Sequence, residues 1–188
     1  FYMQLKDILV YLDDGVSNSE RVKTAFSLAQ LGHARLTGVA LASIKPAHLK
    51  VSDAKAQARI SEQEAMQRVD TFAKEAEQAD IAADTRVIYG DQSTAARKMA
   101  QIARNFDLVI LRQANPGNPN HSIVEAVAEQ VILLSGRPVF FMPYIGAHRI
   151  PCRKAMIAWD GTPAAARAVH DALPLLKNVD EVIILVVK

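Results

Sequence analysis

The end of this sequence repeats its beginning without gaps, at a fixed offset of 147 residues. Matching pairs along the repeat include Lys6 and Arg153, Asp13 and Asp160, Phe26 and Leu173, and Val39 and Val186. A period of this length is about one ordinary domain and is too long for the unit of a solenoid. The repeat therefore predicts one complete domain at residues 4–142, a linker at residues 143–151 and part of a second copy at residues 152–188.

Composition and charge indicate a globular chain that binds neither nucleic acid nor membranes. Of the 188 residues, 50% are apolar and 22% are charged, enough for one packed core but not for two full copies of the unit. The net charge is +2, with basic and acidic residues interspersed, so the basic stripe of a nucleic-acid binder is missing. The longest apolar run, residues 182–187, is far shorter than the ~20 residues of a membrane span. Cys152 is the only cysteine, which excludes an internal disulfide and favours a reducing compartment, so we expect a cytoplasmic protein.

Short apolar runs that predict strands alternate with stretches of helical periodicity. The predicted strands of the first domain are residues 6–12, 36–41, 85–89, 108–111 and 139–142. Capping residues predict helix starts at Ser17, Ser52, Asp91 and Ser122, with capping boxes at Ser17–Glu20 and Ser122–Glu125. In the second copy, a helix at residues 162–177 joins strands at residues 156–159 and 182–187.

This alternation predicts an α/β fold, because a strand followed by a helix and a parallel strand forms a right-handed crossover. We expect an open parallel five-stranded sheet in the order 3-2-1-4-5 with helices on both faces, followed by a partial βαβ repeat. The residues expected to be buried are Ile8, Val10, Phe26, Val39, Val87, Val109 and Val139. Ligands of such sheets bind beyond the carboxyl ends of the strands, where Asp13 and Arg112 are expected to lie.

Three segments of the chain resemble the universal stress protein family. They are ILVYLD at residues 8–13, AMIAWD followed by Gly-Thr-Pro at residues 155–163, and GRPVFFMP at residues 136–143. The resemblance covers one full domain and a partial second one, as in tandem members of the family with a truncated second domain. It implies a homodimer through the last strand of the sheet, whose residues are Val139, Phe140, Phe141 and Met142.

The resemblance also implies where a nucleotide would bind. It places Asp13 near a ribose and Val39 near a base, with Asp160 and Val186 as their counterparts in the second copy. ATP-binding members carry Gly-x-x-Gly, nine residues and then Gly-Ser or Gly-Thr, because glycine lets the backbone approach phosphates.

In this chain all four positions of that phosphate motif have changed, to Arg112, Asn115, Glu125 and Ala126. A carboxylate of Glu125 about 4 Å from a phosphate would be repelled by about 4 kcal/mol at an effective dielectric constant near 20. Alternatively, Glu125 serves only its capping box. Arg112 either meets an anion or pairs with a nearby carboxylate.

We therefore expect a non-enzymatic stress-response protein whose first domain has a degenerate nucleotide site and acts as an interaction and dimerisation module. We expect no catalytic residue, no cofactor and no metal site, since the five histidines are scattered along the chain. The alternative is an ATP-binding, slowly hydrolysing member of the family. A more distant alternative is a receiver-like phospho-acceptor domain, suggested by the pair Asp13-Asp14, although no lysine follows the fifth strand.

Overall fold

The computed structural model describes residues 5–15, 17–44, 51–118, 121–145 and 152–186. The strands are β1 (Asp7–Leu12), β2 (Arg35–Ile44), β3 (Ala83–Asp91), β4 (Leu108–Arg112), β5 (Val139–Met142), β6 (Lys154–Trp159) and β7 (Glu181–Val186). The helices are α1 (Asn18–Gly32), α2 (Val51–Gln78), α3 (Gln92–Ala103), α4 (His121–Ser135) and α5 (Pro163–Leu176). Residue 4 of the predicted first domain, residues 146–151 of the predicted linker and residues 187–188 lie outside the described residues.

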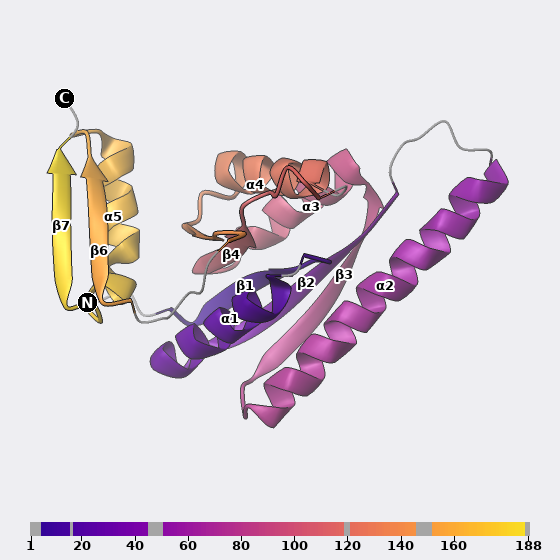
Figure 1. The fold of residues 1–188 in the computed structure, drawn as a ribbon, viewed down its shortest axis with the longest axis horizontal. Helices are drawn as coiled ribbons and strands as arrows, with labels where there is room; N and C mark the ends of the chain where they lie inside the picture. The colour runs from indigo at the N-terminus through magenta and orange to yellow at the C-terminus, as the bar shows by residue number, and fades with distance from the viewer. Residues whose placement is uncertain (1–4, 16, 45–50, 119–120, 146–151, 187–188) are drawn as a thin grey trace.

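The first five strands form one parallel sheet in the order β3-β2-β1-β4-β5, which confirms the predicted fold class and strand order. Helices α1 and α2 cover one face of this sheet, and α3 and α4 cover the other (Figure 1). Side chains alternate along a strand, so β1 contributes to two cores. Ile8 and Val10 pack with α1 and α2, whereas Leu9 and Tyr11 pack with α3 and α4. The central strand is therefore apolar on both sides, as expected for a parallel sheet between two helical layers.

The prediction of buried residues is correct in the centre of the sheet and only partly correct at its edges. Ile8, Val10, Val39 and Val109 are fully buried. Val87 and Val139 are half-buried, because β3 and β5 are the edge strands. Phe26 is half-buried on α1 and packs against the rim of the core.

The long helix α2 packs on the sheet through Phe72, whose ring lies against Gly38 of β2. The buried residues of this helix are Ala65, Val69, Phe72 and Ala76, which share one helical face. A Cβ atom at Gly38 of β2 would lie 2.6 Å from Cδ1 of Phe72, closer than two carbon atoms pack. The rings of Phe72 and Phe26 also meet, with centroids 5.9 Å apart. The absence of a side chain at Gly38 therefore lets α2 approach the sheet.

Three of the four predicted helix starts can be compared with the structure, and neither predicted capping box is found, whereas the third cap is confirmed. Ser17 precedes α1, but its φ of −84° and ψ of 5° differ from the extended conformation, and its side chain caps no N–H group. Ser122 lies inside α4, which begins at His121. By contrast, Asp91 does cap α3, since its Oδ1 accepts a hydrogen bond of 2.8 Å from the backbone N–H of Thr94.

The strands β6 and β7 form a separate parallel pair whose register refines the sequence repeat. In the first copy Tyr11 pairs with Val39, whereas its counterpart Ala158 pairs with Leu185. Leu185, and not Val186, therefore occupies the structural position of Val39. The connection through α5 is one residue shorter than that through α1, so the repeat is not free of gaps in three dimensions.

Candidate functional site

The carboxyl ends of β1 and β4 lie side by side in the middle of the sheet, where Val10 pairs with Ile110. The winding of the sheet reverses here, because β2 and β3 lie on one side of β1 and β4 and β5 lie on the other. Such reversal points are where open parallel sheets bind ligands. Asp13 directly follows β1, and Arg112 is the last residue of β4.

The carboxylate of Asp13 is bound by two arginines from different elements. Its Oδ1 accepts hydrogen bonds of 2.9 Å from Nη2 of Arg21 in α1 and of 2.9 Å from the backbone N–H of Gly15. Its Oδ2 accepts a hydrogen bond from Nε of Arg112. The exposed fraction is 6% for Asp13, 0% for Arg21 and 1% for Arg112. Both carboxylate oxygens are thus engaged, in a cluster that is almost completely shielded from solvent.

Arg21 joins the start of α1 to the end of β1. Its Nε donates a hydrogen bond of 2.7 Å to the carbonyl of Tyr11, and its Nη2 donates one of 2.7 Å to Oδ1 of Asn18. The turn between these elements needs a glycine, since a Cβ atom at Gly15 would lie 3.0 Å from the Arg112 guanidinium. Residues of the turn after β1, of α1 and of β4 therefore all contact Asp13.

The cluster contains two positively charged guanidinium groups and one carboxylate. In the described part of the chain, Nη1 of Arg21 and Nη2 of Arg112 have no hydrogen-bond partner. Burial raises the pKa of Asp13, but the charge of Arg21 and the hydrogen bond and charge of Arg112 outweigh it. The pKa of Asp13 therefore lies below its ordinary value. A buried carboxylate stays ionised only with such partners, because an unpaired charge in the interior is costly.

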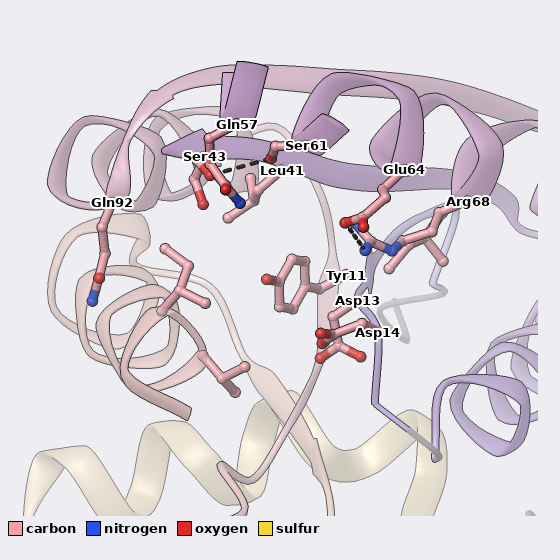
Figure 2. Close-up of a pocket in the computed structure, with 13 residues that line it drawn as sticks. Tyr11, Asp13, Asp14, Leu41, Ser43, Gln57, Ser61, Glu64, Arg68 and Gln92 are labelled. Carbon is pink, nitrogen blue, oxygen red and sulfur yellow. Dashed lines mark hydrogen bonds and ion pairs between the residues drawn. The ribbon is translucent and has the colours of Figure 1, made fainter. Parts of the chain in front are cut away.

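A cavity of about 340 Å³ opens beside this cluster, between α2 and the ends of β1 and β2 (Figure 2). Its apolar wall comes from Leu12, Leu41, Ile123 and Val124, and its polar wall from Tyr11, Asp13, Asp14, Ser43, Gln57, Ser61, Glu64, Arg68 and Gln92. The side chain of Tyr11 projects into the cavity (Figure 2), although only 3% of this residue is exposed. The arrangement offers a small pocket with one apolar side and a hydrogen-bonding rim.

The structure brings two of the five predicted site residues together and leaves three apart. Asp13 and Arg112 are in direct contact, so Arg112 has a carboxylate partner, which is one of its two predicted alternatives, while its Nη2 has no hydrogen-bond partner in the described part of the chain. Val39 is fully buried in the core and does not line the cavity, whereas Leu41 and Ser43 on the same strand do. Asp160 follows β6 and Val186 ends β7, so both belong to the other sheet.

The positions that correspond to the phosphate motif do not form a phosphate cradle. Arg112 is turned to Asp13, and Oδ1 of Asn115 accepts a hydrogen bond of 3.0 Å from the N–H of Gly117. Glu125 is exposed, and its position in α4 is beyond the first helical turn. Its predicted role as the acceptor of a capping box with Ser122 is not supported by this placement.

Sequence reasoning missed Arg21 and the polar residues of α2. An arginine in the first turn of an amphipathic helix is ordinarily a surface residue, and only its neighbour Val22 marked the inward face. Nothing local indicated that residues of α2 would line a cavity at the end of β1. Within the described ranges, no three His, Cys, Asp or Glu side chains are grouped to hold a metal ion, and no helix has the length and apolarity of a membrane span.

No protein-family model matches the sequence, and no curated protein matches it either. Solved structures do match. A universal stress protein from Archaeoglobus fulgidus covers 98% of this chain and 67% of its own, with a TM-score of 0.74 and 15% identity. Universal stress protein UspA from Lactobacillus plantarum covers 74% of this chain and 99% of its own, with a TM-score of 0.58 and 17% identity. The chain has the fold of the universal stress proteins.

Some of the matching structures contain a nucleotide, among them a universal stress protein in complex with cAMP. Another is a universal stress protein from Arabidopsis thaliana with AMP bound, which covers 73% of this chain and 91% of its own, with a TM-score of 0.51 and 7% identity. At such identities the likeness is one of fold, so whether a nucleotide binds here has to be argued from the residues of this chain.

Proposed function

We propose that this chain is a non-enzymatic stress-response protein of the universal stress family, in which residues 4–142 form a domain that no longer binds ATP and acts as an interaction module. The observation that carries the proposal is the engagement of Asp13 by Arg21 and Arg112. The resemblance to the universal stress proteins implies that this aspartate would lie near the ribose of a bound nucleotide. Here both of its oxygens are already bonded within the protein, and the residue is 6% exposed.

The phosphate side supports the same proposal. Arg112 stands at the first glycine position of the family motif, and its guanidinium is buried against Asp13 instead of facing a ligand. The changes at Asn115, Glu125 and Ala126 leave no glycine at any motif position. A triphosphate would therefore meet no open backbone cradle at this place, and the buried guanidinium of Arg112 would have to leave Asp13 to reach it.

We predict that Mg-ATP binds with a dissociation constant above about 10 µM, corresponding to less than about 7 kcal/mol of binding free energy. Isothermal titration calorimetry measures this directly. Arg112→Gly, which restores the first motif glycine and frees one oxygen of Asp13, is the matched variant. Binding of Mg-ATP by the unaltered chain below 10 µM would favour the alternative, an ATP-binding member of the family.

We further propose that the chain forms a homodimer through β5. This strand lies at the edge of the sheet, where one row of backbone hydrogen-bonding groups faces outward, and such edges pair readily with another strand. Val139, Phe140 and Phe141 are only half-buried in the single chain, so a partner strand would cover them further. The two-stranded unit β6–β7, whose strand β7 is exposed at every residue, would be part of a second copy of the domain.

Light scattering after size-exclusion chromatography should give about twice the 20.6 kDa mass of the chain at micromolar concentration. The mass should fall toward that of one chain on dilution, because an edge contact of four residues is small. A single species of monomer mass at all concentrations up to the highest measured would contradict the proposed dimer.

A further inference from the structure

We propose that the groove between α5 and the five-stranded sheet binds a small amphipathic anion, namely a carboxylate with an unbranched apolar chain. The groove lies at the amino ends of β4 and β5, and none of its lining residues lines the cavity beside Asp13. The inference goes beyond the proposed function and does not depend on it. It rests on the shape of the groove, its apolar walls and its charge.

The groove forms where α5 packs against the first domain. Leu175 of α5 and Phe140 of β5 both pack against the edge of the same buried core. Figure 1 shows α5 on the side of the β6–β7 pair that faces the five-stranded sheet. A space of about 460 Å³ remains between α5 and the sheet, within the ~300–1,000 Å³ found for ligand pockets. The space is therefore large enough for a small molecule.

The groove is long and mainly apolar. Its wall on the first domain includes Leu108, Pro138 and Phe140. Its wall on α5 consists of residues three or four positions apart, which share one face of a helix. These residues are Ala164, Arg167, Ala168, Asp171, Ala172 and Leu175. From Ala164 to Leu175 the helix rises by about 16 Å, at ~1.5 Å per residue. An extended chain of about ten carbon atoms, with bonds of ~1.5 Å, fits within that length.

The charged side chains of the walls leave one cation without a carboxylate. They are Arg137, Arg167 and Asp171. Nε of Arg167 donates a hydrogen bond of 2.7 Å to Oδ2 of Asp171, so these two charges balance. Nε of Arg137 donates one of 2.8 Å to the backbone carbonyl of Arg104, and no carboxylate in the described ranges pairs with Arg137. The terminal N–H groups of Arg137 can therefore bind an anionic head group.

The carboxylate of Asp171 does not oppose such an anion directly. Asp171 is 8% exposed, and its Oδ1 is buried without a hydrogen-bond partner among the described residues. The side chain of Arg167, by contrast, is 66% exposed. The surface of the groove thus presents guanidinium groups more than a carboxylate. A carboxylate head group is attracted to them, whereas an ammonium group is repelled.

Decanoate and decylamine, which both have ten carbon atoms and carry opposite charges, are the probes that test the proposal. Calorimetric titration below the micelle-forming concentrations should give a dissociation constant below about 100 µM for decanoate, and binding of decylamine at least tenfold weaker. Octanoate should bind about tenfold more weakly than decanoate, because two fewer CH₂ groups are buried.

Ala168→Phe tests the position of the ligand, because it places a ring in the groove. This substitution should weaken decanoate binding at least tenfold. Ala166→Phe is the matched control, since Ala166 is another exposed alanine of α5 that does not line the groove. It should change the affinity less than twofold.

Arg137→Gln tests the head group. It should weaken decanoate binding about threefold to fivefold, the usual effect of one partly exposed charge pair, and should narrow the difference between decanoate and decylamine. Arg153→Gln, at an arginine whose side chain is 91% exposed and does not line the groove, should leave both affinities unchanged.

Three outcomes would overturn the inference: no decanoate binding at 1 mM, equal affinities for decanoate and decylamine, or equal effects of Ala168→Phe and Ala166→Phe. Circular dichroism of each variant establishes that the fold is retained before the affinities are compared. The result is separable from that for the proposed function, because Mg-ATP binding bears on the carboxyl ends of β1 and β4 and the groove lies at the other end of the sheet.

Discussion

Asp13→Ala is expected to lower the free energy of unfolding by about 3–5 kcal/mol, because removing one partner of a buried ion pair leaves uncompensated charge in the interior. Here the substitution would leave both Arg21 and Arg112 without their carboxylate, at exposed fractions of 0% and 1%. It would also remove the acceptor of the Gly15 N–H group. The loss should therefore be among the largest that a single polar residue of this chain can cause.

Urea denaturation followed by far-ultraviolet circular dichroism measures this loss. Fluorescence is unsuitable, since the single tryptophan, Trp159, lies in β6 and reports on the other sheet. Asp14→Ala is the matched control, because Asp14 is the next residue along the chain and is exposed. It should change the stability by less than about 1 kcal/mol, as surface substitutions usually do. Equal stabilities for Asp13→Ala and Asp14→Ala would contradict the role of the buried cluster.

The same prediction has a pH dependence whose sign follows from the lowered pKa of Asp13. A carboxyl group with a pKa lower in the folded than in the unfolded state contributes stability above its unfolded pKa of about 4. That contribution is lost as the pH falls through the lowered folded value. The difference in stability between the unaltered chain and Asp13→Ala should therefore be constant from neutral pH to about pH 5 and should shrink below about pH 4. A difference that grows on acidification would contradict this assignment.

Phe72→Ala is expected to destabilise the chain by about 3–5 kcal/mol, the usual cost of truncating a buried phenylalanine. Phe72 is 2% exposed and is the largest apolar side chain that α2 contributes to the core. Its loss would remove the contact with Phe26 and leave a cavity above Gly38. Urea denaturation gives the change, with Met66→Ala on the exposed side of α2 as the control. A loss below about 1 kcal/mol would show that α2 is not held by this ring.

Gly38→Ala completes a double-mutant cycle with Phe72→Ala. In the unaltered background the added methyl group would lie 2.6 Å from the Phe72 ring and should cost about 1–3 kcal/mol by overpacking. In the Phe72→Ala background the ring is absent, so the same substitution should cost much less. The two substitutions are thus expected to be strongly non-additive, as is typical of residues in contact. If the two substitutions had additive effects on stability, the cost of Gly38→Ala would not come from contact with the Phe72 ring.

The order of the sheet could be predicted from the sequence because the signals that fix it are local. Apolar runs and helical periodicity depend on neighbouring residues, and their alternation leaves few right-handed parallel arrangements. The cap of α3 at Asp91 was predicted for the same reason, since it involves only a residue three positions away. The failures at Ser17 and Ser122 are also local. Ser17 has a conformation unsuited to capping, and α4 begins one residue before Ser122.

The α/β fold, the strand order and the loss of every glycine from the phosphate motif could all be predicted from the amino-acid sequence. The contact of Arg112 with Asp13 could be seen only in three dimensions, because the two residues are 99 positions apart and are brought together by the pairing of β1 with β4. The burial of Arg21 and the cavity that α2 lines together with Tyr11 were likewise visible only in the folded chain. Patterns of hydrophobicity indicate which face of an element is buried, whereas the partners of a buried charge depend on which elements meet in the folded chain.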